Sequence, residues 1–245
     1  MTREEMMLQN IQHNTVGLDD TFKFHCTQCG KCCIHRDDII LSPMDLFRMA
    51  KELKMSHTDF IHTYCSIHIG SASRMPIIML RPVGKDNRCP LQKANKCSVH
   101  RVKPAVCGMF PLGRYMSFPK GEFNKETIEE CEVNYMLQPP ECGDESETHT
   151  VREWLSDFDI KLEDEAFIRW NQAIFEVGQK IKELENTENM ITMMEVWFVT
   201  RTVMYEMYEH NEDFLPQLEA NHQGLMALLN DIPKLKEVVQ HVRGA

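Results

Sequence analysis

All ten cysteines of this 245-residue chain lie before residue 143, and the last 103 residues contain none. Four of the ten fall within the octet CTQCGKCC, residues 26–33. A cysteine used only as a small core residue would have no reason to avoid the second half of the chain, and burial alone does not call for four thiols in one octet. The distribution therefore predicts a metal or redox site in the first half.

The expected compartment supports this interpretation. The opening sequence MTREEMMLQN is polar and acidic, without the basic and apolar segments of a secretory signal. No stretch approaches the ~20 consecutive apolar residues of a transmembrane helix. We therefore expect a cytoplasmic protein without a membrane partner, and in a reducing compartment dense cysteines are metal or redox sites more often than disulfides.

Charge is divided between the two halves of the chain. Residues 1–120 contain 17 Lys and Arg against 10 Asp and Glu, whereas residues 121–245 contain 10 against 27. Nearby lysine and arginine favour the thiolate form of a cysteine, so the basic half suits a thiolate site. A nucleic-acid partner is not expected, because no Lys/Arg run exceeds two and aromatics are not interleaved with the basic residues.

The octet has the spacing of a thiolate metal site. A Cys-x-x-Cys turn closed by Gly30 lets two thiolates reach one ion, as in zinc ribbons and mononuclear iron sites. Adding Cys32 gives the Cys-x2-Cys-x2-Cys spacing of bacterial ferredoxins, but the fourth cysteine of that motif is absent. Cys89, followed by Pro90, is available instead. Because Cys32 and Cys33 are adjacent, their side chains should diverge, so one packs or each serves a different metal.

A second group of cysteines completes a recognisable pattern. It reads Phe-x-Cys-x2-Cys-x2-Cys-Cys at 24–33, Cys89-Pro-Leu, Cys97-Ser-Val-His100, Lys103-Pro104-x-x-Cys107 and Phe110-Pro111. Over residues 22–115 this resembles the YkgJ-like cysteine-cluster family, whose domain is described as chelating zinc or iron. The resemblance implies a metal site here. The sequence departs from the family pattern at three positions, with His100 in place of Tyr, Lys103 in place of Arg and Gly108 in place of Arg.

Eight cysteines are the candidate metal ligands: Cys26, Cys29, Cys32, Cys33, Cys89, Cys97, Cys107 and Cys131. Cys131 lies just beyond the family-like region and could complete a second site. Cys65 is interpreted as a packed thiol, and Cys142, in an acidic stretch, as free and exposed. His25, His35 and His100 are interpreted as hydrogen-bonding or surface groups near the cluster, with His100 the best ligand candidate among them.

The cofactor follows from counting thiols. Eight exceed one four-ligand site, so one four-iron cluster with another small site and two zinc sites are both compatible. We expect an iron–sulfur cluster or zinc, with the cluster slightly favoured by the third cysteine of the octet and by Cys89-Pro90. Nucleotide-binding glycine motifs and a catalytic constellation are not found, so no catalytic residue is predicted.

Two other functions stay open at this point. One is a zinc-stabilised protein-interaction module, in which the metal closes an irregular domain. The other is an S-adenosylmethionine-dependent protein lysine N-methylase-like enzyme, which is implied because some relatives in the resembled family are flagellin lysine N-methylases. In each case the partner or substrate would be a protein whose identity the sequence does not give.

The fold class is predicted as α+β and mostly helical. An irregular cysteine-rich domain of short strands and helices should be followed by a helical hairpin or bundle. The predicted organisation is a lead-in at 1–21, a cysteine-cluster metal-binding domain at 22–137, a Pro-, Gly- and acid-rich linker at 138–149 and a helical domain at 150–245.

Local elements can also be placed. Strands are expected at 38–41 and 76–82, a helix capped by Ser42 from Pro43, a short helix after Ser56, and a strand pair at 113–123 turning at 119–121. Thr150 and Glu153 form a capping box. Apolar stripes predict three helices, at 167–184, 191–208 and 225–239, the last kinked at Pro233. The methionines in these stripes are assigned to the core: Met190, Met193, Met194, Met204 and Met207.

Overall fold

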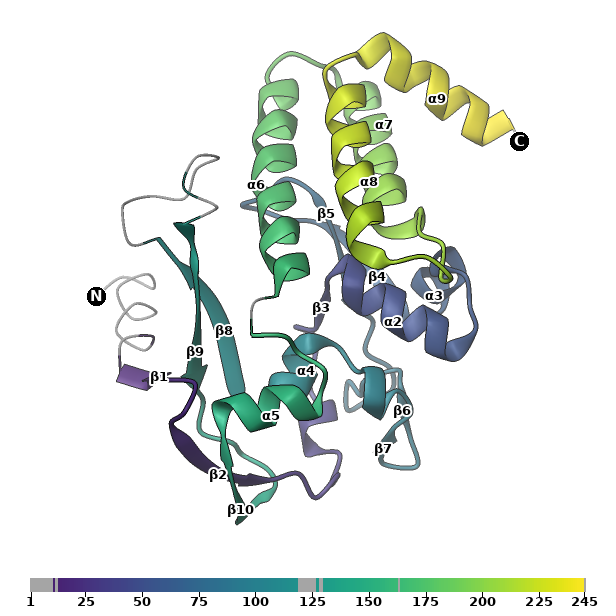
Figure 1. The fold of residues 1–245 in the computed structure, drawn as a ribbon. Coiled ribbons are helices and arrows are strands. Elements are labelled where there is room, and N and C mark those ends of the chain that lie inside the picture. The colour runs from purple at the N-terminus through teal and green to yellow at the C-terminus, as the bar shows by residue number, and fades with distance from the viewer. Residues whose placement is uncertain (1–10, 12, 119–126, 128–129, 163, 245) are drawn as a thin grey trace. The chain divides into compact units, whose positions relative to one another are not determined.

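The computed structural model describes residues 11, 13–118, 127, 130–162 and 164–244 (Figure 1). The chain forms two compact units, which we call unit 1 (residues 1–36 and 83–164) and unit 2 (residues 37–82 and 165–245). This division differs from the predicted domains, because residues 37–82 group with the C-terminal helices. Within the described part of the chain, no helix is both long and apolar enough to cross a membrane. The α+β class is confirmed, and the C-terminal region is helical.

Unit 2 begins with a small sheet and two helices. Strand β5 (Pro76–Leu80) lies between β3 (Ile40–Leu41) and β4 (Cys65–Ile69), and both pairings are antiparallel. Helix α2 (Pro43–Leu53) starts with the predicted Ser42 cap, because the Ser42 hydroxyl accepts from the Asp45 N–H at 3.1 Å. Helix α3 (His57–Tyr64) is capped in the same way by Ser56. These local predictions are confirmed.

Long helices make up the rest of unit 2: α6 (Glu165–Glu185), α7 (Met190–Arg201), a π-helical turn (Thr202–Glu206), α8 (Phe214–Leu229) and α9 (Ile232–Gly244). The predicted third helix, 225–239, is wrong as one kinked element. The chain leaves helical geometry between α8 and α9, and Pro233 lies in the first turn of α9. A proline is tolerated there because the first turn needs no N–H partner inside the helix.

Side-chain contacts join residues 37–82 to these helices. Arg74 forms a salt bridge to Glu185 at 2.7 Å, and its carbonyl accepts the Trp197 indole N–H at 3.1 Å. The Thr58 hydroxyl donates to Glu206 at 2.6 Å. Five methionines were assigned to the core, and this prediction is right for two of them. Met193 and Met204 are buried, while the remaining three are exposed: Met190, Met194 and Met207.

The buried imidazole of His57 makes the stability of unit 2 depend on pH. The His57 ring is stacked on Phe47 and lies 4.6 Å from the His210 ring, centroid to centroid. Burial and the neighbouring His210 lower the pKa of His57 to about 4. Between this value and the unfolded value of about 6.5 the unfolded chain binds more protons, so stability falls as pH falls. We expect a loss on the order of 2 kcal/mol between pH 7 and pH 4.

Urea unfolding monitored by circular dichroism measures this effect. The unfolding midpoint should decrease as pH falls from 6.5 towards 4, and His57→Phe should flatten the decrease. A midpoint with the same pH dependence in wild type and His57→Phe would contradict the prediction.

Unit 1 contains two small antiparallel sheets. One has the order β1 (Thr15–Val16), β9 (Glu132–Leu137), β8 (Leu112–Ser117). The other pairs β2 (Thr21–His25) with β10 (Asp144–Thr150). Part of the predicted linker is therefore a strand. The partner of β8 is residues 132–137, not a segment within 113–123 as predicted, and the predicted turn at 119–121 lies outside the described residues.

Trp154 lies in the core of unit 1. It belongs to α5 (Val151–Asp157), which opens with the predicted capping box of Thr150 and Glu153. Its ring contacts Phe22 and Phe24 of β2 edge-on, and its indole N–H donates to the Met109 carbonyl at 3.0 Å. The core cluster is completed by Met109, Leu112, Tyr135, Val151, Leu155 and Ile160. This core supports β2, the strand that runs directly into the octet.

Candidate metal centre

The octet turns sharply as it leaves β2. Gly30 has a φ of 75°, and it precedes a single 3₁₀ turn at Lys31–Cys33. The Gln92 side chain donates to the Gly30 carbonyl at 3.2 Å, and a Cβ at Gly30 would lie 3.0 Å from the Asn95 carbonyl oxygen. Glycine is needed here because of both the left-handed backbone and the close approach of the neighbouring loop.

Main-chain hydrogen bonds attach the loop at 83–98 to the octet. The Cys89 N–H donates to the Cys33 carbonyl at 2.8 Å, which connects the two cysteine groups directly. Just beyond the octet, the N–H groups of His35 and Arg36 donate to carbonyls at positions 86 and 87. The loop also carries β6 (Gln92–Lys93) and β7 (Lys96–Cys97), a two-residue hairpin that ends at Cys97.

Three thiols accept hydrogen bonds from the main chain just after them. Cys29 accepts from the Lys31 N–H, which is the first cause of its lowered pKa, and also from the Gly143 N–H. Cys89 accepts from two following N–H groups and Cys97 from one, although burial raises the pKa of both. An N–H that points at sulfur stabilises the thiolate. The turn predicted at Gly30 is present, and an N–H is directed at the Cys29 sulfur, as at Cys89 and Cys97. That two thiolates of the octet reach one ion stays a prediction.

The side chains of Cys32 and Cys33 were predicted to diverge, and this prediction is wrong. Their Sγ atoms lie 3.9 Å apart, within the range of a sulfur hydrogen bond. The Cys33 thiol lowers the pKa of Cys32 to about 6 by donating to it, and the positive charges of Lys103 and Arg36 act in the same direction. The pKa of Cys33 is raised because its thiol donates to Cys32 and because it is partly buried. The 3₁₀ turn brings the two side chains to the same side, which an extended chain would not.

Lys103 is held close to the thiols. Its ammonium lies 4.2 Å from the centre of the Phe158 ring. Its charge lowers the pKa of Cys32 and also opposes the burial that raises the pKa of Cys97. The sequence expectation that basic residues accompany the thiolates is met by Lys103 and by Arg36.

Cys142 was predicted to be free and exposed. It is a free thiol, but it is half-buried instead of exposed. Burial raises its pKa to about 11, and the charges of the octet cysteines Cys32, Cys29 and Cys26 add to this effect. The following residue, Gly143, has a φ of 77°, and a Cβ there would lie 2.5 Å from the His25 carbonyl oxygen. The glycine thus lets this segment approach the octet.

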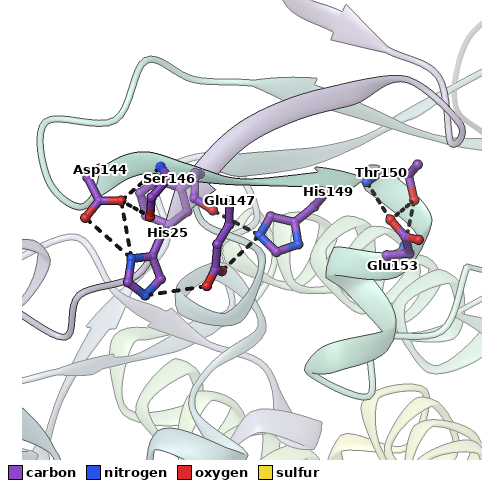
Figure 2. Close-up of polar contacts among 8 residues, drawn as sticks. His25, Asp144, Ser146, Glu147, His149, Thr150 and Glu153 are labelled. Carbon is purple, nitrogen blue, oxygen red and sulfur yellow. Dashed lines mark hydrogen bonds and ion pairs between the residues drawn. The ribbon is translucent and has the colours of Figure 1, made fainter.

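Polar contacts join β2 to β10 just beyond Cys142 in the sequence, as Figure 2 shows for His25, Asp144, Glu147 and His149. The His25 Nδ1 lies 3.3 Å from an Asp144 carboxylate oxygen, and its Nε2 lies 3.7 Å from Glu147. The His149 Nε2 contacts the Phe24 carbonyl at 3.0 Å. These contacts involve the residue before Cys26 and the residues after Cys142, so they tie together the two ends of the site.

The predicted ligands thus differ in how they are placed. Electrostatic or hydrogen-bond coupling links seven cysteines, which we call the thiol set: Cys26, Cys29, Cys32, Cys33, Cys89, Cys97 and Cys142. Cys107 lies in α4 (Ala105–Met109), and Cys131 immediately precedes β9, so their roles as ligands stay predictions. Cys65 is a packed thiol as expected, since it is buried on β4.

The side chains of the thiol set do not form a closed coordination shell as they stand. Among the residues that the structure describes, no three His, Cys, Asp or Glu side chains are grouped so that they could hold one ion. His100 is partly buried, with its Nε2 lacking a hydrogen-bond partner, and burial lowers its pKa. What the structure provides is soft donors of the right chemistry on segments that are joined by main-chain hydrogen bonds.

A family model matches the part of the chain that contains this site. Residues 25–143 match the family model CxxCxxCC, which carries the description "Putative zinc- or iron-chelating domain". Residues 25–143 are therefore similar to this family, and we call them the CxxCxxCC domain. The match begins one residue before Cys26 and ends one residue after Cys142, so it spans the whole thiol set. The expected resemblance is confirmed, and zinc or iron is the metal that the family description names.

A curated relative of this chain has no activity in its name, so it does not indicate a function. An uncharacterized protein of Methanocaldococcus jannaschii, MJ0661, is 25% identical over 88 residues. The alignment covers 36% of this chain and 44% of that protein, so this chain spans less than half of the relative's length. No solved structure matches the chain.

Proposed function

We propose that the CxxCxxCC domain holds an iron–sulfur cluster through thiolates of the thiol set. The observation that carries this proposal is that three cysteine-bearing segments meet. The Cys89 N–H donates to the Cys33 carbonyl at 2.8 Å, and Asp144, two residues after Cys142, pairs with His25, the residue before Cys26. Thiolates are the usual ligands of such clusters. When bound, the cluster would supply one-electron redox chemistry or a structural cross-link between these segments.

The surroundings of the thiols support a metal rather than disulfides. Backbone N–H groups point at the sulfurs of Cys29, Cys89 and Cys97, and such bonds tune thiolate-bound clusters. Lys103 and Arg36 supply positive charge that offsets the thiolates. Seven coupled thiols also exceed the four ligands of one structural zinc ion. A four-iron cluster also takes four thiolates, so the preference for a cluster rests on the ferredoxin-like spacing of the octet and on Cys89-Pro90.

Anaerobic purification followed by an absorption spectrum and metal analysis tests the proposal. We expect brown protein with stoichiometric iron and acid-labile sulfide. Cys142→Ala should lower the bound metal severalfold, because the pairing of Asp144 with His25 and the close approach of Gly143 to the His25 carbonyl bring Cys142 beside the octet. Cys65→Ala is the matched control, since Cys65 lies buried in unit 2, and it should leave the metal content unchanged.

Two results would count against the proposal. Colourless protein that contains stoichiometric zinc would replace the cluster by zinc sites. Metal content that is equally insensitive to Cys142→Ala and Cys65→Ala would exclude Cys142 from the site.

The remaining assignments are also proposals. We place the protein in the cytoplasm, because the cysteines of the thiol set are present as unlinked thiols, which suits a reducing compartment. Neither the family description nor the described residues add support for the lysine N-methylase or for the zinc-stabilised interaction module. The iron–sulfur protein is therefore the function that the site supports best.

A further inference from the structure

We propose that the exposed apolar face at the start of α7 is a docking surface for a basic amphipathic helix of a partner protein. Three neighbouring side chains of this face, which we call the α7 patch, are unusually exposed: Met190 by 66%, Ile191 by 74% and Met194 by 59%. They lie on one side of the helix by their spacing, and residues on the other side, including Met193 and Val196, are buried. Neighbouring exposed apolar side chains of this kind are candidates for an interaction surface.

The chemistry of the patch favours a helical ligand. Methionine side chains are flexible and polarizable, so they adapt to an apolar helix that lies against them. A helix-in-groove partner presents apolar anchors one turn apart. The α7 patch offers a comparable spacing, since Met190 and Met194 are separated by four residues.

The charges around the patch decide which occupant fits. Residues 183–195 contain four glutamates and neither lysine nor arginine. Among the described residues, Glu188 and Glu195 form no ion pair, whereas Glu185 is paired with Arg74. The Glu183 side chain is 68% exposed, and its carboxylate lies 3.3 Å from the Lys180 ammonium. The last turn of α6 and the first turn of α7 lie at the same end of these helices (Figure 1). Glu188 precedes Met190 by two residues, and Glu195 lies one helical turn after Ile191, so these two carboxylates flank the patch.

The glutamates that flank the patch, which we call the acidic rim, disfavour two other occupants. A second copy of the chain docked on the same face would bring glutamates against glutamates, and an anionic membrane surface would be repelled in the same way. A helix with an apolar face and flanking lysines or arginines would bury the methionines and pair with the rim. The patch belongs to unit 2 and does not depend on the proposed metal centre.

A binding measurement on the full-length, metal-loaded protein tests this proposal. The probe is a synthetic amphipathic helix of leucine and lysine, and the comparison peptide has glutamate in place of each lysine. By fluorescence anisotropy at about 0.15 M salt, where exposed charges are screened beyond about 8 Å, we expect the leucine–lysine peptide alone to bind. The triple variant M190Q/I191Q/M194Q should weaken binding about tenfold or more, because it removes the apolar anchors but no charge.

Two further variants sharpen the test. E188Q/E195Q should weaken binding severalfold and reduce its dependence on salt. I67Q/I69Q on β4 is the matched control, because it also replaces exposed isoleucines of unit 2, and it should bind like wild type. Circular dichroism checks that each variant folds. Equal binding by wild type and the triple variant, equal binding of the two peptides, or a wild-type dimer that the triple variant abolishes in sedimentation would each overturn the proposal.

Discussion

Chelation of the metal is expected to raise amide hydrogen exchange by at least about a hundredfold at residues 26–36 and 83–103, and to leave unit 2 unchanged. The two segments contain little regular structure beyond a two-residue hairpin and 3₁₀ turns. In residues 83–103 only Leu91 and Val99 are buried apolar side chains. A structural metal can contribute about 10 kcal/mol or more, comparable with the whole stability of a typical domain.

Hydrogen exchange followed by mass spectrometry, with and without chelator under reducing conditions, measures this change. The double variant Cys29→Ser with Cys89→Ser should reproduce the effect of the chelator, because each sulfur is held by N–H groups on a different segment. Unit 2 serves as the internal reference, since its core of long helices needs no ligand. If residues 26–36 and 83–103 keep their protection without metal, the thiols lie on a self-supporting scaffold.

Trp154→Ala should destabilise unit 1 by about 3–5 kcal/mol, because it removes the largest side chain of the core and leaves a cavity. The indole contacts Phe22 and Phe24 and donates to the Met109 carbonyl. Both phenylalanines belong to β2, the strand that leads into the octet. We therefore expect weaker metal binding as well as lower stability. Trp154→Phe keeps an aromatic ring but leaves the Met109 carbonyl without its donor, so it should cost about 1–2 kcal/mol.

Urea unfolding of the metal-loaded protein gives the stability, and competition with a chromophoric chelator gives the metal affinity. Trp197→Ala is the matched control, because its indole also donates to a main-chain carbonyl, that of Arg74, but in unit 2. It should lower stability without changing the affinity for metal. A Trp154→Ala protein with wild-type metal affinity would show that the octet holds its ligands independently of the core below β2.

Short-range chemistry was readable from the sequence. Ser42 and Thr150 were predicted as helix caps and act as caps, because a cap depends on residues that are three positions apart. The metal-binding family and the turn at Gly30 were predicted for the same reason, since a Cys-x-x-Cys turn is complete within a few residues. The packing of Cys65 was also predicted locally, because no other cysteine stands at metal-ligand spacing from it, and the thiol is buried.

Tertiary structure decided which distant residues meet. Cys142 looked like an exposed thiol in an acidic linker, and it joined the thiol set because β10 pairs with β2 some 120 residues away, at His25 and Asp144. The sequence contains one indication of this approach: Gly143 lacks a side chain and so permits close contact with the octet. Residues 37–82 similarly joined the C-terminal helices through contacts such as Arg74 to Glu185, which composition along the chain does not reveal.

The sequence by itself determined the donor chemistry, the caps and the periodicity of the helices, because each depends on neighbours along the chain. Only the tertiary structure decided that Cys32 and Cys33 face each other, that Cys142 accompanies them, and that Met190 and Met194 face outwards while Met193 is buried. Helical spacing tells which residues share a face, but whether another element covers that face depends on the packing of the whole unit.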